Sequence, residues 1–176
     1  MRADRAEGEV EECFVGKATI KRLSTDLLSE IAARARDNPR LRKNYNLHEL
    51  SERVQRFINV MQPGTYVRPH CHHRSADVNG FELFVVLHGE VGIVVMNDRG
   101  EILQRDRISA SGPTCGIELP EGTYHTLVAL VPDTTLLEVK EGPYNPQTDK
   151  DFLPNFPQEG TPAARHQEEE WRAGFT

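Results

Sequence analysis

Between Val54 and Lys140 the chain alternates short apolar runs with turn residues. The runs are rich in β-branched and aromatic side chains, and glycine, proline, asparagine or aspartate separates them. The predicted strands are Val54–Met61, Thr65–His70, Phe81–Leu87, Val91–Met96, Glu101–Ile108, Gly116–Leu119, Thr126–Val131 and Thr135–Lys140. Short strands at this spacing predict an all-β protein, a jelly roll or closed antiparallel barrel.

A helical period precedes the barrel. The apolar residues Leu27, Leu28, Ile31, Ala32 and Ala35 recur at helical spacing. Ser24 or Thr25 can cap the first turn, and Asn38-Pro39 ends the pattern. We therefore expect residues 1–53 to form an N-terminal segment whose one helix, at about 25–36, packs on a barrel formed by 54–140. A short strand is also expected around 14–20.

Residues 141–176 are predicted to form a C-terminal arm and tail. Five prolines between 141 and 162 exclude regular elements, whereas Tyr144, Phe152 and Phe156 favour burial. We expect an irregular proline-rich arm, residues 141–160, laid across the barrel with these aromatics packed beneath it. The polar stretch after Gly160 carries Trp171 as a large apolar anchor and predicts a short helix or a frayed end. A chain that ends near Gly160 should then be almost as stable as the whole.

Composition limits the function classes. At 176 residues, with 38% hydrophobic and 27% charged residues, the chain fits one globular domain. No apolar run approaches the length of a membrane span, so no membrane association is expected. A net charge of −6 argues against nucleic-acid binding. Three cysteines and a charged N-terminus without an apolar segment argue against a disulfide scaffold and a signal peptide, which predicts a cytoplasmic protein.

Charge is unevenly distributed. Residues 21–43 carry a net +4, and residues 141–176 carry a net −4. One interpretation is that both are solvated surfaces. The other is that the acidic tail packs near the basic segment, within the chain or in a partner subunit.

Three histidines and one glutamate point to a metal. His70 and His72 lie two residues apart in an extended segment, so they project to one side, with Cys71 on the other. Glu82 opens the next strand, and His125 belongs to a later one. Three imidazoles and one carboxylate suit Zn, Fe, Mn, Co or Ni, and residue type does not choose between these divalent ions. Four protein ligands on a six-coordinate ion would leave two open positions.

Further polar residues are candidates for a cavity. Tyr66 and Arg68 share strand parity with the histidines, and Arg68 could bind a carboxylate or phosphate or lean out at the rim. Lys140 shares a face of the last strand with Glu138, either buried or on the outer face. These considerations make Tyr66, Arg68 and Lys140 the candidate catalytic residues.

The run from Arg40 to His48 is interpreted as a loop that either covers the barrel mouth or merely connects elements. The candidate substrate-binding residues in this run are Arg42, Asn44, Asn46 and His48. His73 is expected to be a loop residue rather than a ligand. Cys71 and Cys115 are expected to be buried.

The ligand pattern carries a family resemblance. Gly64-x5-His70-x-His72, then Glu82-x6-Gly89, and later Pro120-x-Gly122-x2-His125 resemble the two motifs of the cupin superfamily. The resemblance implies a cupin jelly-roll barrel, also called a double-stranded β-helix. It also implies that His70, His72, Glu82 and His125 hold a metal, and that the protein is a homodimer, as many cupins are.

A narrower resemblance extends from 41 to 160. The segments Asn44–His48, Pro63–His70, Thr126–Leu130, Glu138–Tyr144 and Asp149–Phe152 resemble the WbuC family of cupin-fold metalloproteins, which occur in bacterial O-antigen gene clusters. The resemblance implies a metal-binding cupin. Our first hypothesis is a metal-dependent enzyme for a small polar metabolite, and the family association suggests a sugar or sugar-phosphate of surface-polysaccharide metabolism. The basic candidate residues favour an anionic ligand. The alternatives are an Fe(II)-dependent dioxygenase and a non-enzymatic ligand-binding or metal-sensing module.

Overall fold

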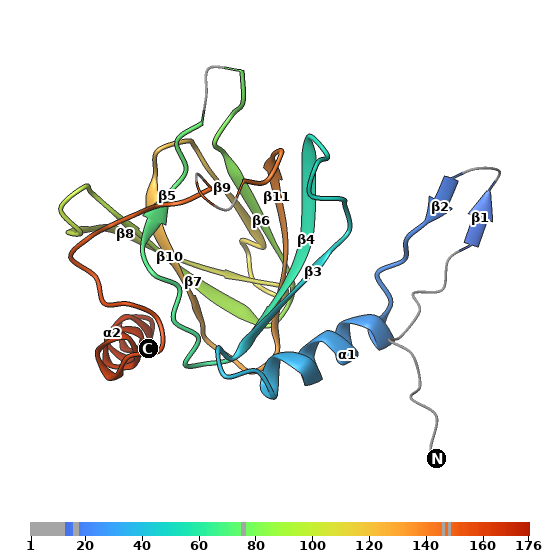
Figure 1. Ribbon diagram of the computed structural model, residues 1–176. Helices are drawn as coiled ribbons and strands as arrows, with labels where there is room; N and C mark the ends of the chain where they lie inside the picture. The colour runs from blue at the N-terminus through green and yellow to red at the C-terminus, as the bar shows by residue number, and fades with distance from the viewer. Residues whose placement is uncertain (1–12, 16–17, 75–76, 146, 148) are drawn as a thin grey trace, which may run out of the picture.

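The structure, a computed structural model, describes residues 13–15, 18–74, 77–145, 147 and 149–176 (Figure 1). The prediction of no signal peptide concerns the charged N-terminal residues 1–12, which lie outside the described residues. Two antiparallel sheets of five strands each form a jelly-roll barrel, as the strand pattern predicts. A separate hairpin pairs β1 (Cys13–Val15) with β2 (Ala18–Ile20).

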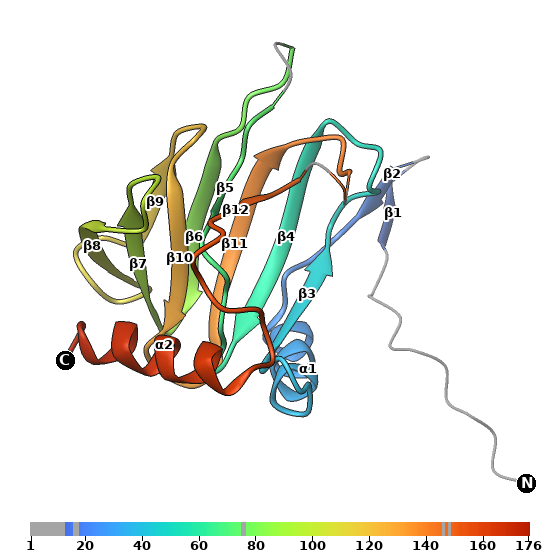
Figure 2. The ribbon, with the colours of Figure 1, turned by 60° about the vertical axis from the view of Figure 1, so that its left-hand side comes forward.

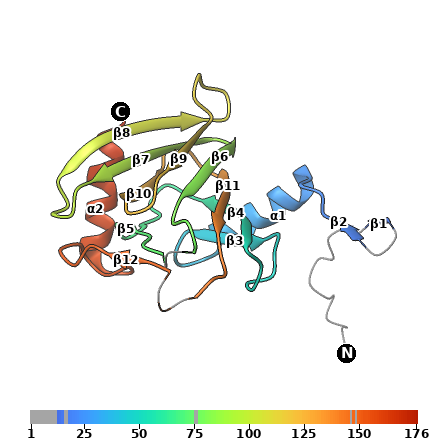
Figure 3. The same cartoon turned by 90° about the horizontal axis from the view of Figure 1, so that it is seen from above.

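Each sheet combines strands that are distant in the sequence. The first sheet has the order β3 (Arg42–Asn46), β4 (Val54–Met61), β11 (Thr134–Glu141), β6 (Glu82–His88) and β9 (Gly116–Leu119). The second has the order β12 (Asp151–Phe152), β5 (His70–Cys71), β10 (Tyr124–Ala129), β7 (Glu90–Met96) and β8 (Ile102–Ser109). Seen from above, the two sheets face each other around the barrel interior (Figure 3).

The apolar core lies inside the barrel. Its buried members come from both sheets and pack as one cluster: Met61, Val67, Phe84, Val86, Val91, Ile93, Ile108, Leu119, Leu127, Ala129 and Leu136. Because side chains alternate along each strand, the other positions face outward. On β4, Ile58 and Val60 therefore pack outside the barrel, against Ile31, Ala32 and Ala35 of helix α1.

One helix covers the outside of each sheet. Helix α1 (Thr25–Arg36) begins as predicted, with the Ser24 side chain accepting a hydrogen bond from the Leu27 backbone N–H at 3.2 Å. Helix α2 (Pro162–Ala173) lies against the sheet that contains β10 (Figure 2). Of the helices in the described ranges, neither has the length and apolar character that crossing a membrane requires.

Three elements differ from the sequence prediction. The run from Arg42 to Asn46 is strand β3, not a loop, because it pairs with β4 over its whole length. The expected strand Thr65–His70 is reduced to β5, since Pro69 cannot donate to a ladder and residues 65–69 adopt no regular structure.

The third difference lies in the arm, where β12 pairs with β5 although the prolines led us to expect no regular element there. The tail beyond Gly160 forms the short helix that was one of its two predicted alternatives. Trp171 is buried, and its ring stacks on that of Tyr66 with centroids 5.7 Å apart. The arm aromatics are less buried than expected: Tyr144 and Phe152 remain 39% and 47% exposed. The apolar anchoring of the C-terminal region therefore comes from α2 more than from these two aromatics.

Candidate metal centre and cavity

The three histidines and Glu82 meet inside the barrel, between the two sheets. His70 on β5 pairs in register with His125 on β10, and His72 follows β5 directly. Glu82 comes from the opposite sheet, where it opens β6. Each of the four is only 2–3% exposed.

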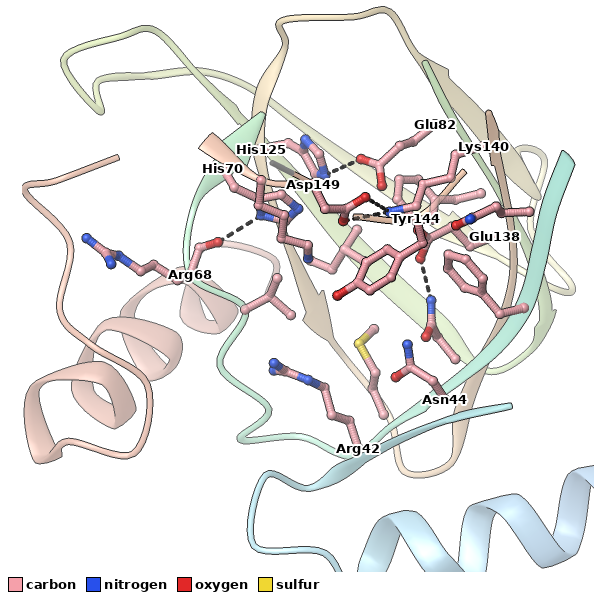
Figure 4. Close-up of a pocket in the computed structure, with 18 of the residues that line it drawn as sticks. Arg42, Asn44, Arg68, His70, Glu82, His125, Glu138, Lys140, Tyr144 and Asp149 are labelled. Carbon is pink, nitrogen blue, oxygen red and sulfur yellow. Dashed lines mark hydrogen bonds and ion pairs between the residues drawn. The ribbon is translucent and has the colours of Figure 1, made fainter. Parts of the chain in front are cut away.

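The side-chain donor atoms of His70, Glu82 and His125 converge on one point (Figure 4). One donor atom each of His70, Glu82 and His125 lies within 4.8 Å of the others. The Nε2 atoms of His72 and His125 lie 3.0 Å from Oε1 and Oε2 of Glu82, respectively. The carboxylate therefore lies between two of the imidazoles.

Backbone carbonyls fix the orientation of all three imidazoles. Nδ1 of His70 lies 2.9 Å from the Arg68 carbonyl, and Nδ1 of His125 lies 3.0 Å from the Thr123 carbonyl. Nδ1 of His72 contacts the Asp149 carbonyl. A carbonyl only accepts, so each Nδ1 must carry the proton. Each Nε2 then presents its lone pair to the interior, the arrangement typical of metal-ligating histidines.

The buried polar atoms fit a divalent ion. The Nε2 atoms of His72 and His125 and Oε2 of Glu82 make no aligned hydrogen bond, despite the short His–Glu distances. Such unsatisfied buried atoms are costly unless something else binds them. Three imidazole nitrogens and one carboxylate oxygen form a donor set that suits a transition metal.

Electrostatics keep His70 and Glu82 in their ligating forms. Burial, reinforced by the charge of Lys150, holds the pKa of His70 well below its usual range. Burial alone would raise the pKa of Glu82, but His125 and His72 outweigh it and hold that pKa well below its usual range. Neutral His70 and ionised Glu82 are the states that bind a cation.

A cavity of about 480 Å³ opens from this cluster. Its polar lining comes from β3, β4, β11, the segment before β5 and the arm: Arg40, Arg42, Asn44, Asn46, His48, Gln55, Asn59, Arg68, Glu138, Lys140, Tyr144, Asp149, Lys150 and Glu159. This size matches pockets for small metabolites.

A buried ion network forms one wall of the cavity. The Lys140 ammonium donates to both oxygens of Asp149, at 3.1 and 2.9 Å, and Arg74 donates to Oδ1 at 2.8 Å. Beside it, the Asn59 amide donates to Glu138 at 2.5 Å. Burial, with the Glu82 charge adding to it, raises the pKa of Glu138 to about 8. Glu138 is therefore mostly protonated at neutral pH.

The cavity is net positive. Five basic side chains line it against three carboxylates that are ionised at neutral pH, since Glu138 is protonated. Glu159 pairs with Arg40 at 2.8 Å and with Arg42 at 3.0 Å. That pairing joins the acidic tail to the basic segment within one chain, the second of the two interpretations of the charge distribution. Lys150 reaches the cavity from the arm, and no described residue forms a hydrogen bond or ion pair with it.

The structure brings most of the sequence-predicted candidates to this cavity. Arg42, Asn44 and Asn46 share one face of β3 and line it, as do His48 and Arg68 at its edge. Lys140 and Glu138 are buried on the inner face of β11, not on its outer face.

The inward orientation expected for Tyr66 is wrong. Its hydroxyl donates to the Pro157 carbonyl at 3.0 Å, and its ring faces Trp171. Strand parity does not apply there, because residues 65–69 are irregular. Cys71 is buried as expected, but Cys115 is exposed.

Several cavity residues were not predicted from the sequence. Asn59 could have been found, because it is a polar residue between Phe57 and Met61 on the inner face of an apolar strand. Asp149, Lys150 and Glu159 could not, because they lie in an irregular arm where no periodicity indicates which side chains turn inward.

Comparisons with known proteins agree with the fold. The family model described as "Domain of unknown function (DUF6016)" matches residues 23–108. No curated protein matches the sequence. KdgF from Halomonas sp. is 19% identical over 60% of this chain and 82% of its own, with a TM-score of 0.46. The capsular polysaccharide assembling protein CapF from Staphylococcus aureus is 22% identical, with a TM-score of 0.51.

The CapF alignment covers 62% of this chain but 29% of the CapF chain. A cupin superfamily protein from Desulfitobacterium hafniense is 18% identical over 57% of this chain and 76% of its own, with a TM-score of 0.44. At 22% identity and a TM-score of 0.51, the likeness to CapF shows the fold alone.

Proposed function

We propose that this cupin-fold protein is a metal-dependent enzyme that acts on a small anionic metabolite bound in the barrel cavity. The observation that carries the proposal is the position of the four donors. His70, Glu82 and His125 converge inside the barrel, next to a net positive cavity, and Nε2 of His72 lies 3.0 Å from Oε1 of Glu82. A ligand that enters the cavity would therefore meet both the ion and the basic side chains.

The chain's own residues supply binding and proton transfer. Lys150, which forms no hydrogen bond or ion pair with a described residue, and Arg42 would attract and orient the anionic group. Glu138 can donate a proton at neutral pH, and Asp149 holds Lys140 in place through two hydrogen bonds. A divalent ion bound at the four donors would polarise a substrate oxygen as a Lewis acid.

The proposed substrate class is a sugar or sugar-phosphate, and its place in surface-polysaccharide metabolism follows from the resemblance to the WbuC family. The metal is one of Zn, Fe, Mn, Co or Ni. A cytoplasmic location and a homodimer stay predictions of the sequence. Light scattering of the purified protein tests the dimer.

The test begins with metal analysis of anaerobically purified protein, followed by a thermal-shift screen of sugar-phosphates, sugars and small carboxylates. We call the site formed by His70, His72, Glu82 and His125 the inner site. We expect His72→Ala and His125→Ala to abolish metal binding there. Lys150→Met should still bind metal at the inner site, but anionic ligands should no longer raise its melting temperature. Asp98→Asn, at an exposed turn, is the control that should change neither.

Other outcomes would favour the alternatives. Iron in the inner site, with dioxygen consumed on addition of ligand, would indicate an Fe(II)-dependent dioxygenase. Stabilisation by a ligand without any turnover would indicate a binding or metal-sensing module. Full metal content in both His72→Ala and His125→Ala would show that these residues are not ligands.

A further inference from the structure

The outer face of the same strand carries a second cluster of donor atoms. Cys71 lies between His70 and His72, so its side chain faces the opposite side of the sheet. In register, Cys71 pairs with Asp151 of β12. His73, two residues further along the extended chain, projects to the same outer side as Cys71.

Cys71, His73 and Asp151 are in direct contact. The Cys71 sulfur lies 3.4 Å from Nδ1 of His73, and Oδ2 of Asp151 lies 3.1 Å from the same nitrogen. All three donor atoms lie within 4.8 Å of one another. Cys71 is fully buried, whereas the side chains of His73 and Asp151 are 59% and 52% exposed, so the cluster opens to solvent on one side.

This geometry is not that of a nucleophile–base–acid triad. In such a triad the nucleophile and the carboxylate contact different nitrogens of the imidazole, so that a proton can pass across the ring. Here the thiol and the carboxylate both meet Nδ1. Three donors that converge in this way are instead arranged to share one cation.

We propose that Cys71, His73 and Asp151 form a second metal site, open to solvent, for a borderline-soft divalent ion such as Zn²⁺. Tetrahedral zinc with usual bond lengths places a sulfur and a nitrogen ligand about 3.6 Å apart, and a nitrogen and an oxygen about 3.4 Å apart. The observed 3.4 and 3.1 Å need to open by only about 0.2–0.3 Å to reach those separations.

The chemistry of the outer site differs from that of the inner one. Its sulfur ligand suits zinc or cobalt better than magnesium or calcium, which prefer oxygen. On binding, the Cys71 thiol would release its proton to solvent and ligate as thiolate. Three protein ligands leave the fourth position to water or an exchangeable ligand. The two sites share one strand but no ligand residue.

Co²⁺ added to the full-length protein distinguishes the two sites. Thiolate ligation gives a strong near-ultraviolet sulfur-to-cobalt absorption, which an inner site without sulfur cannot produce. We expect this absorption in the wild type and in His125→Ala, and its loss in Cys71→Ser, His73→Ala and Asp151→Asn. With excess Zn²⁺ followed by desalting, His73→Ala should retain one ion fewer per chain than the wild type.

Matched cysteine variants exclude other thiols. Cys115→Ser and Cys13→Ser should keep the absorption unchanged. His73→Ala and Asp151→Asn alter exposed side chains, so they report on the site even if Cys71→Ser fails to fold. Absence of the cobalt–sulfur absorption in the wild type would overturn the proposal. So would its survival in both His73→Ala and Asp151→Asn.

Discussion

At the scale of single residues, Asp149 has the most partners around the inner site. Its carboxylate accepts hydrogen bonds from Lys140 and Arg74, and its backbone carbonyl contacts Nδ1 of His72. Asp149 is 3% exposed, and the side chains of both cations are also buried. One carboxylate therefore balances two buried positive charges.

Removal of that charge should destabilise the protein. Asp149→Asn removes the carboxylate that both Lys140 and Arg74 contact, and breaking a buried ion pair on one side costs about 3–5 kcal/mol. Urea denaturation should show a free energy of unfolding lower by about that amount. The exposed control Asp98→Asn should unfold as the wild type does, and an identical midpoint for both variants would contradict the prediction.

Glu138 should make stability depend on pH in the metal-free protein. Burial raises its folded-state pKa to about 8, above its ordinary value near 4.5. Between these values the folded state binds more protons, so this contribution to stability is complete below about pH 4.5 and is lost as pH rises through about 8. The difference in unfolding free energy between wild type and Glu138→Gln should therefore shrink from about pH 5 to about pH 8.

The exposed Glu118→Gln provides the matched control for Glu138→Gln, because its difference from wild type should stay constant over the same pH range. Urea denaturation at each pH, after chelation of metal, gives the measurement. A constant difference for Glu138→Gln as well would show that Glu138 is ionised in the folded protein.

Strand parity explains which residues of the inner site could be predicted. His70 and His72 project together because the chain around them is extended, and the sequence pattern shows that directly. The same rule fails four residues earlier at Tyr66, where Pro69 interrupts the strand. Asp149 and Lys150 reach the cavity through an irregular arm, whose path depends on tertiary contacts rather than on any local period.

At the scale of elements, α2 is the part that sequence reasoning undervalued. Thr161 caps it by accepting a hydrogen bond from the Ala164 backbone N–H at 3.2 Å. Its buried stripe contains Glu168, which makes the pattern look polar. Oε1 of that carboxylate accepts from the Gly64 backbone N–H and from Arg172, both at 3.1 Å, whereas the buried Oε2 has no hydrogen-bond partner among the described residues.

Trp171→Ala should destabilise the protein by about 3–5 kcal/mol, the usual cost of truncating a buried aromatic residue. The loss removes the stacking on Tyr66 and leaves a cavity beside the second sheet. His166→Ala changes an exposed residue of the same helix and should have little effect in urea denaturation. A chain that ends at Gly160 should be less stable still. Equal stability of the shortened and full-length chains would restore the frayed-end interpretation.

At the scale of the whole molecule, the apolar core and the inner metal centre adjoin in one barrel, where the ring centroids of Phe84 and His125 lie 6.1 Å apart. The core is nevertheless a cluster of eleven buried apolar side chains from both sheets, whose burial needs no metal. Chelation should therefore remove metal while far-ultraviolet circular dichroism stays unchanged. Loss of the strand signal on chelation alone would mean that the metal is needed for folding.

The position of the arm in the sequence determines when the inner site can form during synthesis. His72 is oriented by the Asp149 carbonyl, and β5 gains its outer neighbour from β12, so both depend on residues near the end of the chain. A ribosome releases the N-terminal strands first. Just before residues 149–152 leave the exit tunnel, the four residues of the inner site are already outside it. At that stage His72 lacks the contact with the Asp149 carbonyl that orients its imidazole. We therefore expect the inner site to be complete only after residues 149–152 have left the ribosome.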